Sequence, residues 1–223
     1  MAPLVTAVFG LLLAGLVINL LTRALQDRRT ANQLKYDLLS QITEVASTLF
    51  HYAGLYHRAR AEAATPTVGA GNIVNSSKEL DELRKELLAR HATGRTQTDV
   101  LEARLAAYFD EPRVAIAWHA VRDCLTVRVY NAIGGPEQLL REVVRENSKG
   151  WEGRYHTGLA ENELADSYKV WKAYDCHLKA TTKLILACPL RPHKITRRAR
   201  QAIGRALDAA EALGFDYKES NED

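Results

Sequence analysis

The feature that most constrains this chain is an apolar run at its start. Residues 3–21 read PLVTAVFGLLLAGLVINLL, and no charged side chain comes before Arg23. A helix needs about twenty apolar residues to cross the ~30 Å hydrocarbon core of a bilayer. The run is longer than the apolar part of a usual signal peptide, and the basic start and cleavage site of such a peptide are missing. The sequence therefore predicts a transmembrane anchor over residues 1–24.

The charges that follow the run predict its orientation. The segment after the run contains one acid, Asp27, and four basic residues, Arg23, Arg28, Arg29 and Lys35. Because positively charged flanks stay on the cytoplasmic side, we expect a single-pass protein with its N-terminus outside and its C-terminal domain in the cytoplasm. Three widely spaced cysteines do not form a disulfide framework, which agrees with a reducing compartment. The lipid bilayer is then the first expected partner.

The rest of the chain is expected to be helical. Alanine, leucine, arginine and glutamate are abundant, and only six prolines interrupt the sequence. The expected fold class is all-α, with a single N-terminal transmembrane helix that continues into a cytoplasmic multi-helix bundle. Turn residues then divide the chain into a juxtamembrane helix over 25–64, a loop over 65–77, a bundle domain over 78–216 and a polar tail over 217–223.

Two sequence patterns concern self-association. Gly10 and Ala14 form a small-xxx-small pair, which lets two membrane helices approach closely. Apolar residues then recur at steps of four and three, as an a/d-type stripe formed by Leu38, Ile42, Val45, Leu49, Tyr52 and Tyr56. This stripe fits either a coiled-coil stalk that makes a dimer or a helix that packs inside its own subunit. The second reading is favoured, because the stripe lasts under three heptads.

The expected core lies in residues 113–133. This segment is apolar on most faces, and a helix is favoured although the alternation at Leu125, Val127 and Val129 leaves a strand open for 124–130. Further helices are expected to start near Ser77, to end at Gly94, to restart at Thr96 or Thr98, and to cover 159–188 and 196–213. The side chains expected to be buried are Trp118, Val121, Leu125, Trp171 and Leu178.

A search for catalytic motifs is negative. The chain has no metal-binding or nucleophile signature and no complete phosphate or dinucleotide loop, so we expect no cofactor and no metal. An enzyme would have to assemble its site from dispersed groups, for which the candidates are His119, Asp123, Trp151, Arg154, His156 and His177.

Two segments could bind a partner. The first is basic, with no acid between Arg191 and Asp208, and its contact residues for a membrane or other anionic surface are Arg191, Lys194, Arg197, Arg198 and Arg205. A solvated outer helix face is the favoured reading, anionic lipid headgroups come next, and nucleic acid is disfavoured by a net charge of only +3. The second is a loop with a candidate ligand or partner surface formed by Trp151, Arg154, Tyr155 and His156.

These patterns favour an interaction protein over an enzyme. The leading expectation is a membrane-anchored helical scaffold module on the cytoplasmic face, which binds a protein partner or forms a homo-oligomer. The Ala/Arg-rich usage fits a bacterium with GC-rich DNA. A bacterial membrane effector or defence component falls within the class of interaction proteins, although no residue pattern selects it. The alternative is a membrane-associated enzyme that acts on a lipid or nucleotide, and a pocket at which His119, Asp123 and His177 converge would favour it.

Overall fold

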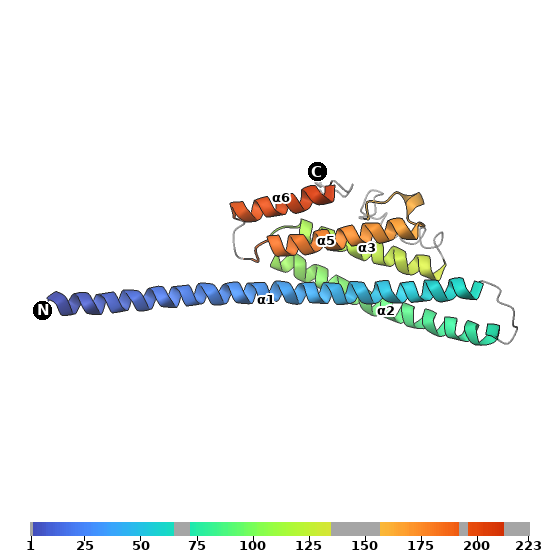
Figure 1. Cartoon of the computed structure of the whole chain (residues 1–223), viewed down its shortest axis with the longest axis horizontal. Helices are drawn as coiled ribbons and strands as arrows, with labels where there is room; N and C mark the ends of the chain where they lie inside the picture. Colours follow the sequence, from blue (N-terminus) through green and yellow to red (C-terminus); the bar gives the residue numbers. More distant parts are fainter. Residues whose placement is uncertain (1, 65–71, 135–156, 192–195, 212–223) are drawn as a thin grey trace. The chain divides into compact units, whose positions relative to one another are not determined.

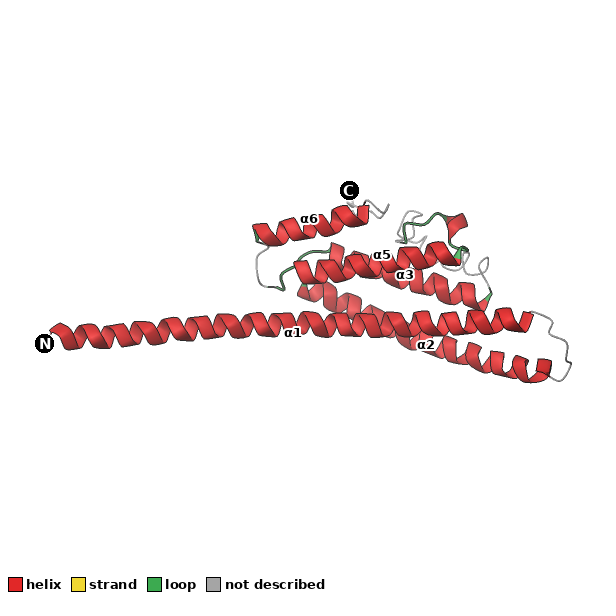
Figure 2. Cartoon of the chain, in the orientation of Figure 1, coloured by secondary structure: helices red, strands yellow, loops and turns green. Residues whose placement is uncertain are grey.

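The chain is all-α in the part that the structure describes, as the sequence predicted. The computed structural model describes residues 2–64, 72–134, 157–191 and 196–211, and the side chains of residues 2–21 and 72–76 lie outside this set. The described helices are α1 (Ala2–Ala64), α2 (Asn72–Tyr108), α3 (Arg113–Ile133), α5 (Ser167–Ala187), α6 (Arg197–Glu211) and the 3-10 turn η1 (Glu161–Glu163) (Figures 1 and 2). The chain divides into two compact units, residues 1–40 and 41–223.

The predicted membrane anchor is corrected. Among the residues that the structure describes, no helix has an apolar stretch long enough to cross a bilayer. This finding contradicts the single-pass topology and, with it, the external N-terminus and the cytoplasmic placement. α1 does not end with the apolar run but extends to Ala64, a length of 63 residues in all, and Arg23, Asp27, Arg28 and Arg29 are exposed along it. The run itself, with Gly10 and Ala14, lies in the segment whose side chains are outside the described set.

The second half of α1 is a bundle helix. Ile42, Val45, Leu49 and Tyr56 are all less than a tenth exposed, so the reading in which this stripe packs inside its own subunit is confirmed. The stripe contributes to an apolar cluster with α2 and α3, which contains Ala53, Tyr56, Leu87, Val129 and Ala132. A face buried in this way is not available for a coiled-coil partner.

α2 runs through the position at which a helix end was expected. Gly94 lies inside this 37-residue helix, and α2 begins at Asn72 rather than near Ser77. A Cβ atom at Gly94 would come within 2.7 Å of Leu49 Cδ1. The glycine is therefore required by the close approach of α1 and α2 and not by a turn, so the predicted break was wrong.

α3 is the central element, and its helical state confirms the favoured prediction for 124–130. Ten of its residues are buried, among them Trp118, Val121 and Leu125 as expected. The Trp118 indole donates its N–H to the carbonyl of Thr98 on α2 at 3.1 Å. α3 ends at Gly134, whose φ of 92° is the left-handed conformation that favours glycine.

α5 starts later than predicted and turns a different face inward. Asp166 caps its first turn by accepting hydrogen bonds from two backbone amides, so the helix begins at Ser167 rather than near residue 159. The buried residues are Val170, Ala173, Tyr174, His177, Ala180, Thr181, Leu184 and Ile185. Trp171 is 44% exposed, so its predicted burial was wrong, and Leu178 is partly buried. The buried face of α5 includes small residues such as Ala173 and Ala180, whereas the sequence analysis placed Trp171 on it.

α6 is the outer helix of the second unit. It packs against α5, and Ile203 and Ala206 are its buried residues. Before it, the chain passes alongside the end of α2, where Phe109 and Leu190 form an isolated antiparallel bridge and the Arg191 amide donates to the Tyr108 carbonyl at 2.9 Å. This contact fixes the chain just ahead of the basic segment.

Candidate functional site

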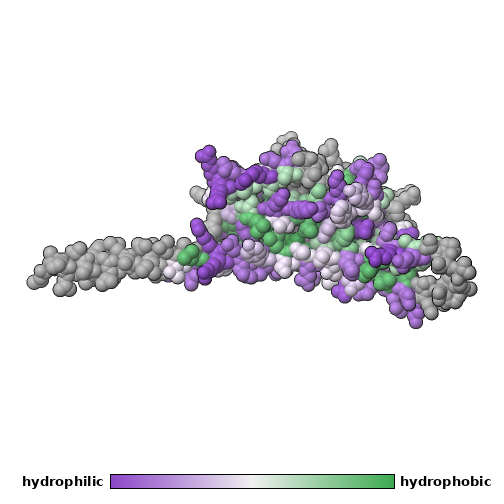
Figure 3. Space-filling model, viewed as in Figure 1, coloured by the Kyte–Doolittle hydropathy of each residue, from purple (hydrophilic) through white to green (hydrophobic). Residues whose placement is uncertain are grey.

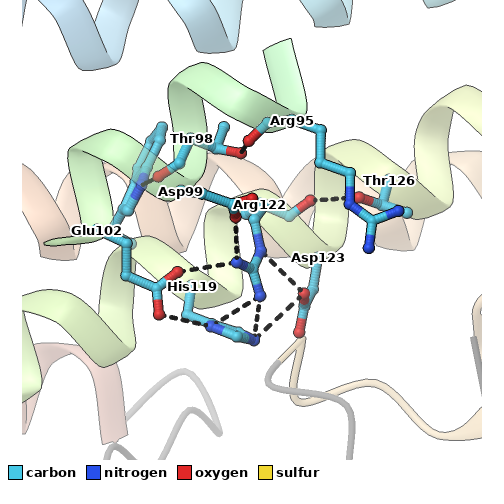
Figure 4. A network of polar contacts seen from close by, with 9 residues as sticks. Arg95, Thr98, Asp99, Glu102, His119, Arg122, Asp123 and Thr126 are labelled. Carbon is cyan, nitrogen blue, oxygen red and sulfur yellow. Dashed lines mark hydrogen bonds and ion pairs between the residues drawn. The ribbon is translucent and has the colours of Figure 1, made fainter. Parts of the chain in front are cut away.

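The most concentrated polar chemistry lies between α2 and α3. Arg122 of α3 is its centre (Figure 4). One guanidinium nitrogen, Nη1, donates to Asp99 Oδ1 at 3.0 Å and to Glu102 Oε2 at 2.9 Å, both on α2. The Nε atom lies 3.8 Å from Asp123 Oδ1 on α3. One arginine thus contacts three carboxylates and links α2 to α3.

His119 completes this network. Its Nδ1 lies 3.1 Å from Glu102 Oε1, and its Nε2 lies 2.7 Å from Arg122 Nη2 and 3.6 Å from Asp123 Oδ1. Arg122 Nη2 also lies 2.9 Å from Nδ1, so the ring is enclosed by Glu102, Arg122 and Asp123. The sequence candidates His119 and Asp123 therefore do meet, four residues apart on one helix.

The groups of the network satisfy one another. Burial acts to raise the pKa of Glu102, but the hydrogen bond and charge of His119 and the charge of Arg122 outweigh burial, so this pKa lies below its ordinary value. A carboxylate held ionised by an arginine is a poor general base or acid near neutral pH. The arrangement fits a structural clamp better than a catalytic centre.

The sequence analysis missed the α2 half of this clamp. Asp99 and Glu102 look like ordinary solvated residues of a charged helix, and 17 positions separate Glu102 from His119. The chain reverses at Asp110-Glu111-Pro112 between α2 and α3, which brings the two helices side by side. The sequence did contain one signal for this contact, which is the opposite sign of the charges on the two sides of the turn. Asp99 and Glu102 precede the turn, and His119 and Arg122 follow it.

His177 does not join the pair of His119 and Asp123. It is 1% exposed within α5, and its Nε2 lies 3.1 Å from the carbonyl oxygen of Thr157, which is itself fully buried. His177 therefore holds the segment before α5 in place, as buried histidines with a hydrogen-bond partner commonly do. The three-residue convergence that would favour an enzyme is not formed.

A second group with unusual electrostatics lies where α1, α3 and α5 meet. The Arg128 guanidinium lies over the Phe50 ring at 5.0 Å, and that ring stacks on Tyr174 at 4.8 Å. Burial lowers the pKa of Arg128 and, with a smaller contribution from Asp175, raises the pKa of Tyr174 to about 12. The Arg128 Nε atom has no hydrogen-bond partner among the described residues. The aromatic face offers partial compensation for this desolvated charge.

A cavity lies between the second half of α1 and the middle of α2. Its volume is about 320 Å³, and its apolar floor is formed by Val45, Leu49, Gly94 and Leu101. The other lining residues, all polar except Val100, are Gln41, Glu44, Thr48, Arg90, Thr93, Thr96, Gln97 and Val100. The cavity lining includes no member of the Arg122 clamp and no histidine. The titratable residues in its lining are Glu44 and Arg90.

The predicted partner loop cannot be placed. Trp151, Arg154, Tyr155 and His156 lie outside the described residues, and so does Lys194 of the basic segment. Arg191 is described, and it forms an ion pair with Asp110 at the end of α2. Its charge is already balanced, so it is a weaker candidate for an anionic partner than the sequence suggested.

The remaining predicted basic residues line the outer side of α6. Arg197, Arg198 and Arg205 are exposed, as is Arg200, whereas Ile203 and Ala206 point into the protein. Figure 3 shows hydrophilic side chains gathered over the N-terminal end of this helix. Thr196 caps the helix, because its hydroxyl accepts from the Ala199 amide at 3.2 Å. We call Arg197, Arg198 and Arg205 the basic face.

An exposed aromatic pair lies at the start of α5. Tyr168 is 67% exposed and Trp171 is 44% exposed, and their ring centroids are 6.0 Å apart. A spacing of three residues places both rings on one side of the helix, just after the Asp166 cap. The sequence analysis assigned Trp171 to the core, so this surface was missed.

Neither a metal centre nor a known relative identifies the site. In the described ranges, His, Cys, Asp and Glu side chains form no group of three that could hold a metal ion. All three cysteines are free thiols, and burial raises the pKa of Cys124 well above its ordinary value, with smaller contributions from Asp123 and Cys176. No protein-family model, curated protein or solved structure matches this chain.

Proposed function

We propose that the protein is a non-catalytic helical interaction module that binds a protein partner, a second copy of itself included. The observation that carries this proposal is the exposed pair Tyr168 and Trp171. Tryptophan and tyrosine are enriched among residues that dominate the energy of protein interfaces. Two large rings that lie side by side in solvent contribute little to the stability of the isolated protein. A partner protein that covers them explains their exposure better.

The position of the pair supports a binding role. Both rings stand in the first turns of α5, which is held by the Asp166 cap and by its buried face against α3. A rigid helix presents side chains with little loss of conformational entropy on binding. The polar clamp around Arg122 supports the same proposal, since its acids and bases are engaged with each other. An enzyme that acts on a lipid or nucleotide would need free groups around a pocket.

The experiment is photo-crosslinking in the native host cells. The full chain carries benzoylphenylalanine in place of Trp171 in one variant and in place of Lys183 in the matched control. Lys183 is exposed on the same helix, three turns farther along. We expect one discrete crosslinked species from position 171 that is absent from position 183, and Tyr168→Ala should weaken it. Equal patterns from the two positions, or no crosslink at 171, would contradict the proposal.

A further inference from the structure

Two arginines of the basic face lie at the N-terminal end of α6, where the helix dipole disfavours positive charge. Arg197 and Arg198 occupy the first two helical positions after the Thr196 cap, and the first turn contains no acid. The acids Asp208 and Glu211 lie at the other end of the helix. A helix N-terminus carries partial positive charge, so cations there are destabilising and acids are favoured. The charge order along α6 is therefore the reverse of the one that stabilises a helix.

Nothing in the described part of the protein balances these charges. Arg197, Arg198 and Arg205 are exposed, and none of them has an acidic partner among the described residues. By contrast Arg90, Arg113, Arg122 and Arg191 all form ion pairs with acids of the same chain. Within the described residues, the basic face therefore costs helix stability and gains no ion pair in return.

We propose that the basic face binds a short acidic segment of a partner protein. This inference rests on the proposed function as an interaction module and names the chemistry of one partner. Guanidinium groups bind carboxylates with two parallel hydrogen bonds, and the positive end of the helix dipole adds to the attraction. From Arg197 to Arg205 the helix rises about 12 Å, which matches roughly four residues of an extended chain.

Other anionic partners fit this face less well. Its outward positions contain no aromatic side chain on which a nucleic-acid base could stack, and the chain has a net charge of only +3. Asp208 lies on the same outward side one turn beyond Arg205, where a uniformly charged nucleic acid or lipid surface would meet an acid. A short segment can end before it reaches Asp208.

The experiment measures peptide binding to the full chain by fluorescence anisotropy. The probe is a labelled ten-residue peptide in which Glu and Asp alternate with Ser, and its twin has Gln and Asn in place of the acids. We expect binding of the acidic peptide alone, with release at about 0.5 M salt, where screening is strong. The charge-reversed variant R197E/R198E should weaken binding at least about tenfold.

The matched control is R28E/R29E, which reverses two neighbouring exposed arginines on α1. It should leave peptide binding unchanged, and Trp171→Ala should do the same, which separates this inference from the proposed function. Circular dichroism should show the same helix content in every variant. Equal loss in both double variants, equal binding of the neutral peptide, or tighter binding to duplex DNA or phosphatidylglycerol vesicles would overturn the inference. In that case a position-specific crosslink at residue 171 would still support the interaction module.

Discussion

Replacement of Arg122 with methionine is the sharpest test of the clamp between α2 and α3. Methionine keeps much of the side-chain volume but leaves Asp99, Glu102 and Asp123 without their shared cation. The Arg122 side chain is 24% exposed, while Glu102 is 30% and Asp123 13% exposed. Asp99 is 57% exposed, so its pair contributes little. We expect the substitution to lower the free energy of unfolding by about 2 kcal/mol, mainly through loss of the contacts with Glu102 and Asp123.

The pH dependence gives this prediction its sign. The pKa of Glu102 is depressed in the folded protein, so its stabilising contribution is complete above the unfolded value and is lost as pH falls through the folded value. Without Arg122 this pKa should rise, and the mutant should lose less stability on acidification than the wild type. The difference between the two proteins should therefore shrink from pH 7 to about pH 3.

The assay is urea denaturation of both proteins at the two pH values. Arg104→Met is the control, because Arg104 is an exposed arginine on α2 that hydrogen-bonds to Gln41 and touches no member of the clamp. A cycle with Glu102→Gln should show a coupling energy with Arg122 above about 0.5 kcal/mol. A mutant as stable as the control at pH 7, or a difference that does not change with pH, would refute the reasoning.

Substitutions at four positions test the packing and the helix ends, each by urea or thermal denaturation. Trp118→Ala should cost about 3–5 kcal/mol because that ring is fully buried, whereas Trp171→Ala should cost under about 1 kcal/mol; equal losses would contradict the placement of the two rings. Gly134→Ala should cost about 1–2 kcal/mol through its positive φ, and more if the Arg60 side chain that the new Cβ would meet cannot move; an unchanged melting temperature would be inconsistent with that geometry. Asp166→Ala should cost about 1 kcal/mol and Asp166→Asn much less, because asparagine also caps helices.

The sequence alone determined the fold class and the positions of most helices. Helical periodicity and composition are local properties of the chain, so the long first helix, the helical state of 113–133 and the basic helix near 197–211 followed from them. Burial of Trp118 also followed, since its neighbours are apolar on nearly every side. The basic face was visible for the same reason, because the side of a helix on which a residue lies depends only on its spacing.

Only the tertiary structure decided the features that depend on a neighbouring helix. Gly94 has the same local signature whether it ends a helix or admits Leu49, and the contact with α1 selects the second role. Trp171 looks like a core residue until α3 packs on the small residues of the opposite side of α5 and leaves the ring in solvent. The clamp around Arg122 joins groups 17 to 23 positions apart. Periodicity reports which residues share a face, but the partner that covers a face is a property of the assembled bundle.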